Sequence, residues 1–351
     1  MTPRERILAT IKRQPVDRPP VDIWCTPEVL EVLKRYTGED DELAVYHALG
    51  LDKIVFIFPG YGGRYFDPND SGEITPWGVP TRMMKAGLAT YQEYINPPLA
   101  GFNDVSQLAD YPLWPSPDNF DYDGAKALAD KARAYHFATI GPWISHFEIY
   151  CQMRGLENAL MDTLANPDFL EAALDRIEAI QTEMLKRLLT ELSDRIDIIF
   201  ISDDMGMQES LLVPIEVWQT HFKPRLKRWC DLIHHYGKIV LFHTDGAVLP
   251  LIPELIECGI DILNPIQHAC PGMDIAVLKE RFGNDLIFHG GIDNQTVLPL
   301  GTKQDVIDET RACLETLGRD GGYICCSCHN AQAGTPVENI LAMIETVKKV
   351  D

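Results

Sequence analysis

The chain has 351 residues, of which 52 are acidic and 31 are lysine or arginine, and its formal net charge is −21. A surface this acidic repels phosphate backbones, so we exclude nucleic acid as a partner. The amino terminus has no apolar signal core, and no apolar run approaches the roughly 18 residues of a membrane span. We therefore expect a cytoplasmic protein that does not enter a membrane.

Strand-like and helix-like segments alternate along the chain. The first helix is predicted over 2–13, where Thr2, Pro3 and Glu5 form a capping-box sequence. Short apolar runs bounded by turn residues are typical of buried parallel strands. Eight such runs follow one another: VDIW (21–24), KIVFIF (53–58), FATIG (137–141), IDIIFIS (196–202), KIVLFH (238–243), IDILNP (260–265), LIFHG (286–290) and GYICCS (322–327). Helices are expected around them at 27–36, 41–49, 122–135, 145–164, 167–192, 214–236, 249–258, 274–282, 303–317 and 336–350.

A long excursion, residues 59–120, interrupts this alternation after the second strand. It is rich in glycine, proline and aromatic residues, and long irregular segments in compact domains are usually lids or binding loops. The sequence ITPWGVPTRMM…ATYQEYINPP predicts hairpin strands within it. We expect the excursion to cover a site and to wall it with aromatic side chains drawn from Tyr61, Tyr65, Phe66, Trp77, Tyr91, Tyr94 and Trp114.

Eight strands with helices between them predict a (β/α)₈ TIM barrel, formed as a single domain over residues 1–351. An open, doubly wound sheet is the alternative. No strand is followed by G-x-G-x-x-G or by a Walker phosphate loop, so the sequence gives no sign of a nucleotide site.

Polar residues collect where the predicted strands end, which is where barrel enzymes carry their active sites. The groups in these positions can bind a metal, move a proton or contact a substrate. In chain order they are Trp24, Trp143, His146, Glu148, Asp203, Asp204, Gln208, His243, Asp245, Asn264, His289 and His329.

Their chemistry suggests three roles. His243, Asp245 and His329 offer nitrogen and oxygen ligands for one zinc ion with an open position. The groups expected to orient substrate or to move a proton are Asp203, Asp204, Gln208 and Glu148. The groups expected to contact substrate are Trp24, Trp143, His146, Asn264 and His289. Plainer roles stay open: a hydrogen-bonded core position for His243 and helix caps for Asp203, Asp204 and Asp245.

Six stretches of the chain resemble the uroporphyrinogen decarboxylase superfamily, and in particular its cobalamin-dependent methyltransferases of the anaerobic O-demethylase kind. They are RERILATIKRQPVDRPPVDIW, RGLENALMDTLANPDFL, SDDMGMQESLLVPIEVWQTHFKPRLKRW, FHTDGAVLPLIPELIECGIDILNPIQ, FHGGID and GYICCSCHNAQAGTPVENILAM. The resemblance implies a (β/α)₈ barrel, in agreement with the strand count.

Methyltransferases of this kind bind zinc through a His-x-Cys pair and a later cysteine. Here His243 matches the histidine and Asp245 stands where the cysteine would be, while His329, next to Cys328, stands at or beside the third position. A harder His/Asp/His set suits an oxygen substrate such as a methyl ether better than a thiol, and it leaves the identity of the metal open.

Decarboxylases of the superfamily hold their polyanionic substrate with arginines in a Met-Arg-Gln-Ala-Gly-Arg signature, but the corresponding stretch here, VDIWCTPEVLEV, has none. The corrinoid-binding motif Asp-x-His-x-x-Gly is also missing, so a corrinoid would be carried by a partner protein.

We therefore expect transfer of a methyl group from a small methoxylated or methylated substrate to the cobalt of that partner. A decarboxylase or lyase of a small acid and a non-catalytic ligand-binding paralogue are the alternatives, and a homodimer is left open.

Overall fold

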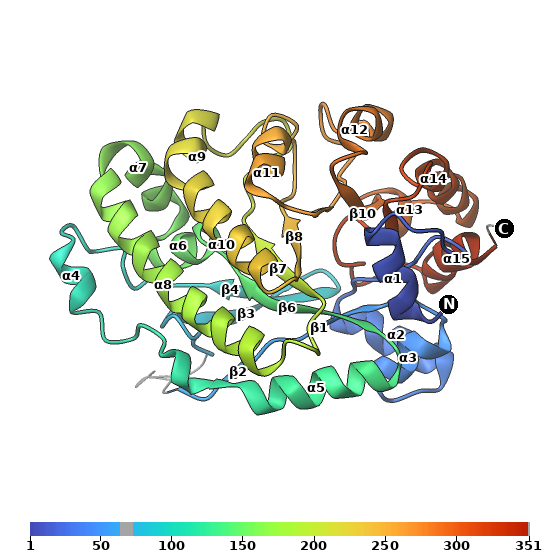
Figure 1. Cartoon of the computed structure of the whole chain (residues 1–351), viewed down its shortest axis with the longest axis horizontal. Coiled ribbons are helices and arrows are strands. Elements are labelled where there is room, and N and C mark those ends of the chain that lie inside the picture. The colour runs from blue at the N-terminus through green and yellow to red at the C-terminus, as the bar shows by residue number, and fades with distance from the viewer. Residues whose placement is uncertain (64–72, 350–351) are drawn as a thin grey trace.

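The computed structural model describes residues 1–63 and 73–349. Tyr65, Phe66 and the last predicted helical residue, Val350, lie outside the described residues. The described part of the chain is an α/β fold built on a curled parallel sheet, with the long helices packed around its outside (Figure 1). The amino terminus and the last helix, α15, lie on the same side of the molecule (Figure 1).

The sheet has seven strands in the order β1-β6-β7-β8-β9-β10-β11, all of them parallel. Their bounds are β1 (Ile54–Phe56), β6 (Ala138–Ile144), β7 (Ile198–Ser202), β8 (Ile239–His243), β9 (Ile262–Asn264), β10 (Ile287–Ile292) and β11 (Tyr323–Ser327). Each overlaps one of the predicted runs, and β6 and β10 extend beyond the predicted ends by three and two residues. Because successive strands of the sheet are neighbours and helices connect them, the architecture is TIM-barrel-like.

The first predicted strand, 21–24, forms only isolated bridges, from Val21 to Cys325 and from Cys25 to Ala331. Pro19 and Pro20 precede it and have no N–H to donate, which limits the pairing. The segment nevertheless touches both edges of the sheet. Asp22 N donates to Cys325 O of β11 at 2.8 Å, and Val21 O accepts from the N–H just before β1, that of Asp52, at 2.8 Å.

Nine helices of the described chain follow the predicted ranges within a few residues. They are α1 (Pro3–Ile11), α2 (Pro27–Thr37), α3 (Glu42–Ala48), α5 (Tyr122–Ala134), α8 (Pro167–Glu191), α11 (Ile252–Cys258), α12 (Ile275–Phe282), α14 (Lys303–Thr316) and α15 (Val337–Lys348). The capping box of α1 forms between Thr2 and Glu5 as its sequence predicts. No described helix has both the length and the apolar character needed to cross a bilayer.

Two segments predicted as single helices are each divided into two. Residues 145–164 form α6 (Phe147–Arg154) and α7 (Leu156–Ala165), because Gly155 adopts φ 85°, a value that ends a helix. Residues 214–236 form α9 (Ile215–His221) and α10 (Lys223–His235), separated at Phe222. Pro224, the second residue of α10, has no N–H to continue the α9 ladder.

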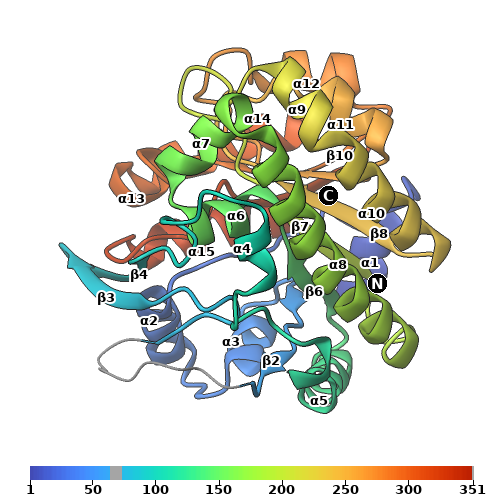
Figure 2. The same ribbon diagram turned by 90° about the vertical axis from the view of Figure 1, so that its left-hand side faces the viewer.

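Between β1 and α5 the chain forms small elements rather than one irregular loop. They are β2 (Gly60–Tyr61), β3 (Thr81–Ala86), β4 (Ala89–Tyr94), α4 (Ser106–Ala109), the 3₁₀ helix η1 (Pro117–Asn119) and β5 (Phe120–Asp121). β3 and β4 pair as an antiparallel hairpin, which projects from the body of the molecule in Figure 2. A further short helix, α13 (Val297–Leu300), precedes α14.

A buried arginine fastens part of this region to the helices. Arg154, at the end of α6, donates through Nη1 to Leu99 O at 2.6 Å and to Phe102 O at 2.8 Å. Its Nε donates to Asp162 of α7 at 2.7 Å.

Alternation along the strands decides which side chains face the inside of the curled sheet. Its inner cluster takes every second residue, for example Ile198 and Phe200 of β7 and Leu241 of β8. The same period carried to the ends of the strands places Ser202, His243, Asn264 and His289 on that inner side. A run of apolar residues thus ends in polar groups that point toward the sheet's carboxyl edge, which we call the mouth.

Candidate metal and substrate site

His243, Asp245 and His329 meet at the mouth although they come from distant parts of the sequence. Their ligand atoms all lie within 4.8 Å of one another. His243 Nε2 is 3.9 Å from Asp245 Oδ2, and the two imidazole ring centroids are 5.7 Å apart. The structure therefore brings together all three residues predicted to bind metal.

A buried hydrogen-bonded series, which we call the relay, leads from His243 into the interior of the sheet. His243 Nδ1 contacts Asn264 Oδ1 at 2.5 Å, and Asn264 Nδ2 contacts His289 Nδ1 at 2.6 Å. His289 Nε2 contacts Asp22 Oδ2 at 3.2 Å. Lys53 Nζ donates to the other oxygen of Asp22 at 3.1 Å. Lys53, Asp22, His289, Asn264 and His243 are all buried.

The charge at the inner end of the relay is balanced. Burial alone would raise the pKa of Asp22, but Lys53 and His289 outweigh it and hold that pKa below its ordinary value. Asp22 is thus a carboxylate that can only accept hydrogen bonds. Cys326 lies within 4.8 Å of Asp22 and His289, yet burial raises the pKa of its thiol well above the usual range. We interpret this inner group as an ion pair rather than a second metal site.

Burial shifts the pKa of each of the two other predicted metal ligands toward the uncharged form. Burial lowers the pKa of His329 below its ordinary value, although Asp245 opposes the shift, so the ring is neutral near pH 7. Burial also raises the pKa of Asp245, opposed by His243. Neutral imidazole nitrogens and a carboxylate oxygen are the donor set that zinc accepts.

Two further carboxyl groups, Glu148 and Asp204, lie beside this cluster. Asp204 Oδ1 is 3.8 Å from His243 Nε2 and accepts the N–H of Asp245 at 3.1 Å. Glu148, in the first turn of α6, accepts from Ser202 Oγ at 2.5 Å. Burial, together with Asp204 and Asp203, raises the pKa of Glu148 to about 8. A carboxyl that is mostly protonated at pH 7 can act as a proton donor.

Asp203, unlike Glu148 and Asp204, is hydrogen-bonded to the backbone at the start of α6. Its Oδ1 accepts from the backbone N–H of Phe147 at 2.7 Å and of Glu148 at 3.1 Å, and from Ser145 Oγ at 2.6 Å. Its Oδ2 accepts from His146 N at 3.2 Å. These donors are the free groups that begin α6, so Asp203 caps that helix. Its predicted catalytic role stays a prediction, and the geometry favours the cap.

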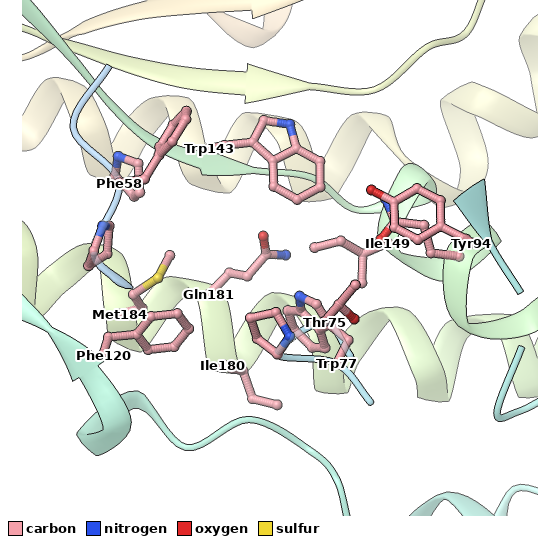
Figure 3. A pocket seen from close by; sticks show the side chains of 14 residues that line it. Phe58, Thr75, Trp77, Tyr94, Phe120, Trp143, Ile149, Ile180, Gln181 and Met184 are labelled. Carbon is pink, nitrogen blue, oxygen red and sulfur yellow. The ribbon is translucent and has the colours of Figure 1, made fainter. Parts of the chain in front are cut away.

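A cavity of about 430 Å³ lies beside the mouth, between β6, α6, α8 and the excursion (Figure 3). The described residues that line it include no lysine, arginine, aspartate or glutamate. They are Phe58, Pro59, Thr75, Pro76, Trp77, Tyr94, Phe120, Pro142, Trp143, Ile149, Gln152, Ile180, Gln181 and Met184. Such a lining favours an uncharged, apolar ligand.

Aromatic contacts connect this cavity to the metal-binding cluster. Ring centroids lie 5.2 Å apart between Phe58 and Phe56, 5.3 Å between Phe56 and Phe200, and 5.9 Å between Phe200 and His243. Trp143 pairs with Phe200 across the sheet. At the far side, burial and then Glu148 raise the pKa of the cavity residue Tyr94. The cavity therefore lies close to Glu148, and the rings of Phe56 and Phe200 stand between its residue Phe58 and His243.

With this geometry in place, the comparisons with known proteins identify the family. The family model described as uroporphyrinogen decarboxylase (URO-D) matches residues 89–350. The chain belongs to the uroporphyrinogen decarboxylase family.

A methylated-thiol–coenzyme M methyltransferase of Methanosarcina mazei is 23% identical over 211 residues, covering 58% of this chain and 51% of the relative. A uroporphyrinogen decarboxylase of Anaeromyxobacter sp. is 27% identical over 129 residues, covering 35% of this chain and 34% of that protein. The chain thus spans about half or less of the curated relatives that it matches.

A solved structure described as a methyltransferase from Methanosarcina mazei matches over 99% of both chains with a TM-score of 0.70 at 18% identity. At that identity the match shows a shared fold. Together these likenesses fit the methyltransferase branch of the superfamily, as the sequence motifs predict.

The residues predicted to contact substrate do not all reach the mouth. Trp143 lines the cavity, whereas Asn264 and His289 are buried members of the relay. Trp24 is also buried, with its ring centroid 5.7 Å from that of His243. His146 is buried and stacks on Trp229 of α10 at 3.6 Å between centroids.

Gln208, predicted to be catalytic, is exposed and contacts Gln267 Nε2 at 3.5 Å. It therefore lies on the rim. Sequence reasoning missed Asp22, whose partner His289 lies on a strand far along the chain, and Lys53, which pairs with Asp22. The alternation that makes Trp24 face inward also makes Asp22 face inward, and that was the available signal.

Proposed function

We propose that this protein is a methyltransferase that moves a methyl group from a small, neutral methylated compound to the cobalt of a corrinoid carried by a separate protein. A methoxylated aromatic ring is the donor that the cavity fits best. The observation that carries the proposal is the mouth itself: two imidazoles and a carboxylate have ligand atoms within 4.8 Å of one another, near a cavity whose described lining has no charged side chain. The whole chain, 1–351, would act as one domain.

The residues of the chain divide this work between them. Trp143, Phe58 and Tyr94 would hold the apolar body of the donor, with the excursion as the covering wall. His243, Asp245 and His329 would hold a zinc ion, which when bound supplies a Lewis acid for the donor's oxygen. The corrinoid of the partner supplies the methyl-accepting metal.

Glu148 is the group best placed to deliver a proton to the oxygen that the methyl group leaves. Its carboxyl is mostly protonated at pH 7, and Ser202 fixes one of its oxygens. Asp204 would orient the donor beside His243, and Gln208 on the rim would contact the incoming partner. The proton that the product oxygen gains would thus come from Glu148 rather than from bulk water.

A decarboxylase acting on a small acid is the rival within the family. Two features weigh against it: the described lining of the cavity offers no cationic group to a carboxylate, and the buried Asp203 already accepts four hydrogen bonds. A ligand-binding paralogue without activity would keep the cavity but not require metal ligands at the mouth.

The test is incubation of the purified protein with a reduced corrinoid protein and a panel of methoxylated aromatics, methylamines and methylated thiols. The cobalt spectrum reports methyl transfer, and metal analysis reports zinc. We expect methylation with neutral methoxylated rings, one zinc per chain, and loss of both in His243→Ala. Release of carbon dioxide from an acid without corrinoid would establish the rival. Absence of turnover with every donor, in protein free of metal, would establish the paralogue.

A further inference from the structure

The relay has a direction that the hydrogen bonds determine. Asp22 is a carboxylate and can only accept, so His289 Nε2 donates to it. A neutral His289 then accepts at Nδ1, where the Asn264 amide donates. Asn264 Oδ1 accepts in turn, so His243 Nδ1 carries a proton. The proton-free nitrogen of His243 is therefore Nε2, the atom that faces Asp245.

The orientation of the central amide has independent support. Asn264 Nδ2 also lies 3.4 Å from the backbone oxygen of His289, which can only accept. An amide turned the other way would place two oxygens against each other. Lys53 supplies the positive charge beside Asp22, so His289 is not required to be an imidazolium.

We propose that Asp22, His289 and Asn264 are positioning residues that fix His243 in the tautomer with a free Nε2 lone pair, ready to bind a metal. The inference rests on the zinc site of the proposed function and adds the residues that orient one of its ligands. The same arrangement of a second partner on the other imidazole nitrogen is general among metal-binding histidines.

Asp22→Asn tests the direction of the relay without changing the size of the side chain. An amide at position 22 can donate to His289 Nε2, which moves the proton of His289 to Nδ1. The Asn264 amide must then accept from His289 and donate to His243 Nδ1. We expect a substantial share of His243 to appear in the Nε2–H tautomer. Zinc affinity, measured by competition with a chelator, is expected to fall by about 10- to 100-fold.

Asp52→Asn is the matched control. Asp52 is as buried as Asp22 and is likewise paired with cations, Arg6 and Arg18, beside the same 20–22 segment, but it is outside the relay. We expect Asp52→Asn to lower stability while leaving the His243 tautomer and zinc affinity at wild-type values.

The double variant Asp22→Asn/Asn264→Asp should restore both readouts, because a carboxylate at 264 accepts directly from His243 Nδ1–H. Asn264→Leu supplies a second route if Asp22→Asn does not fold. It removes the hydrogen bond to His243 Nδ1, and we expect part of His243 to adopt the Nε2–H tautomer, as in Asp22→Asn.

The tautomer is read from ¹⁵N NMR of metal-free protein labelled at histidine, with His243 assigned by its absence in His243→Gln. Wild-type tautomer and zinc affinity in both Asp22→Asn and Asn264→Leu would overturn the proposal. Zinc retained in His243→Ala but lost in Asp22→Asn would overturn it too, since the metal would then lie among Asp22, His289 and Cys326. A wild-type protein that binds no zinc but shows the expected tautomers would refute the metal site and leave the relay standing.

Discussion

The cap formed by Asp203 gives the sharpest prediction about stability. Asp203→Ala removes the acceptor for three backbone N–H groups and one hydroxyl at the buried start of α6. Losing a cap costs about 0.5 to 2 kcal/mol, and each buried donor left without a partner costs about 1 to 3 kcal/mol. Because Glu148, one of the donors, is only partly buried, we expect a loss of about 3 to 5 kcal/mol in the free energy of unfolding.

Asp203→Asn separates the cap from the charge. If its oxygen takes the place of Oδ1, three of the four hydrogen bonds remain and only the one from His146 N is lost. Burial raises the pKa of Asp203 to about 6, so its ionisation in the folded protein weakens stability. The amide removes that penalty, and we expect a net loss of about 1 kcal/mol or less at pH 7.

Urea unfolding followed by circular dichroism measures both variants, with Asp204→Asn, a partly exposed neighbour, as the control. The raised pKa of Asp203 also determines whether its contribution to stability rises or falls with pH. Since the folded-state pKa is raised above 3.8, the folded protein holds the proton longer, and this group's contribution to stability declines as pH rises from about 4 to about 6. Asp203→Asn should flatten that decline.

Two results would refute this reasoning. One is an Asp203→Ala variant as stable as the wild type. The other is an Asp203→Asn variant that is as unstable as Asp203→Ala. A stable Asp203→Asn variant that has lost all methyl transfer would instead reinstate Asp203 as a catalytic residue.

Three further predictions follow from the site and its support. Glu148→Gln should flatten the decline in stability between about pH 4.5 and pH 8 that its raised pKa imposes on the wild type, and should slow turnover while leaving zinc bound; an unchanged pH profile would contradict the assigned protonation. Trp143→Ala should weaken binding of a neutral aromatic donor by about 10-fold, measured as a rise in KM at an unchanged zinc content, whereas an unaltered KM would place the donor elsewhere. Arg154→Met leaves Asp162 buried without its cationic partner, with only the Tyr150 hydroxyl still donating to it, and should lower the free energy of unfolding by about 3 to 5 kcal/mol. Hydrogen exchange should then quicken at Leu99 and Phe102, and equal protection in both proteins would show that Arg154 does not hold this segment.

The sequence predicts the sheet well because its strands are short apolar runs with a period of two, which local pattern detects. The same period predicts that His243 faces inward, and that led to the cluster with Asp245 and His329. Breaks at Gly155 and Phe222 were missed, because the apolar periodicity of each long segment continues across them. Gly155 and Pro224 were the available signals, since glycine and proline inside a helical pattern can each end a helix.

The hydrogen bonds of the relay could not be predicted from local sequence patterns. Asp22, Asn264 and His289 are separated by up to 267 positions, and only the closeness of the first extended segment to β11 and β10 brings them together. The sequence left two roles open for Asp203 because an acid after a strand can serve either a substrate or the next helix. Only the directions of the neighbouring N–H groups distinguish the two.

The 20–22 segment holds both edges of the sheet and also carries the carboxylate at the inner end of the relay. A movement of this segment that displaces Asp22 would therefore be transmitted through the relay to the imidazole of His243. By the same linkage, a cation bound at the mouth would stabilise the contacts between the 20–22 segment and the two edge strands. Metal binding and the stability of these contacts would then report on one equilibrium.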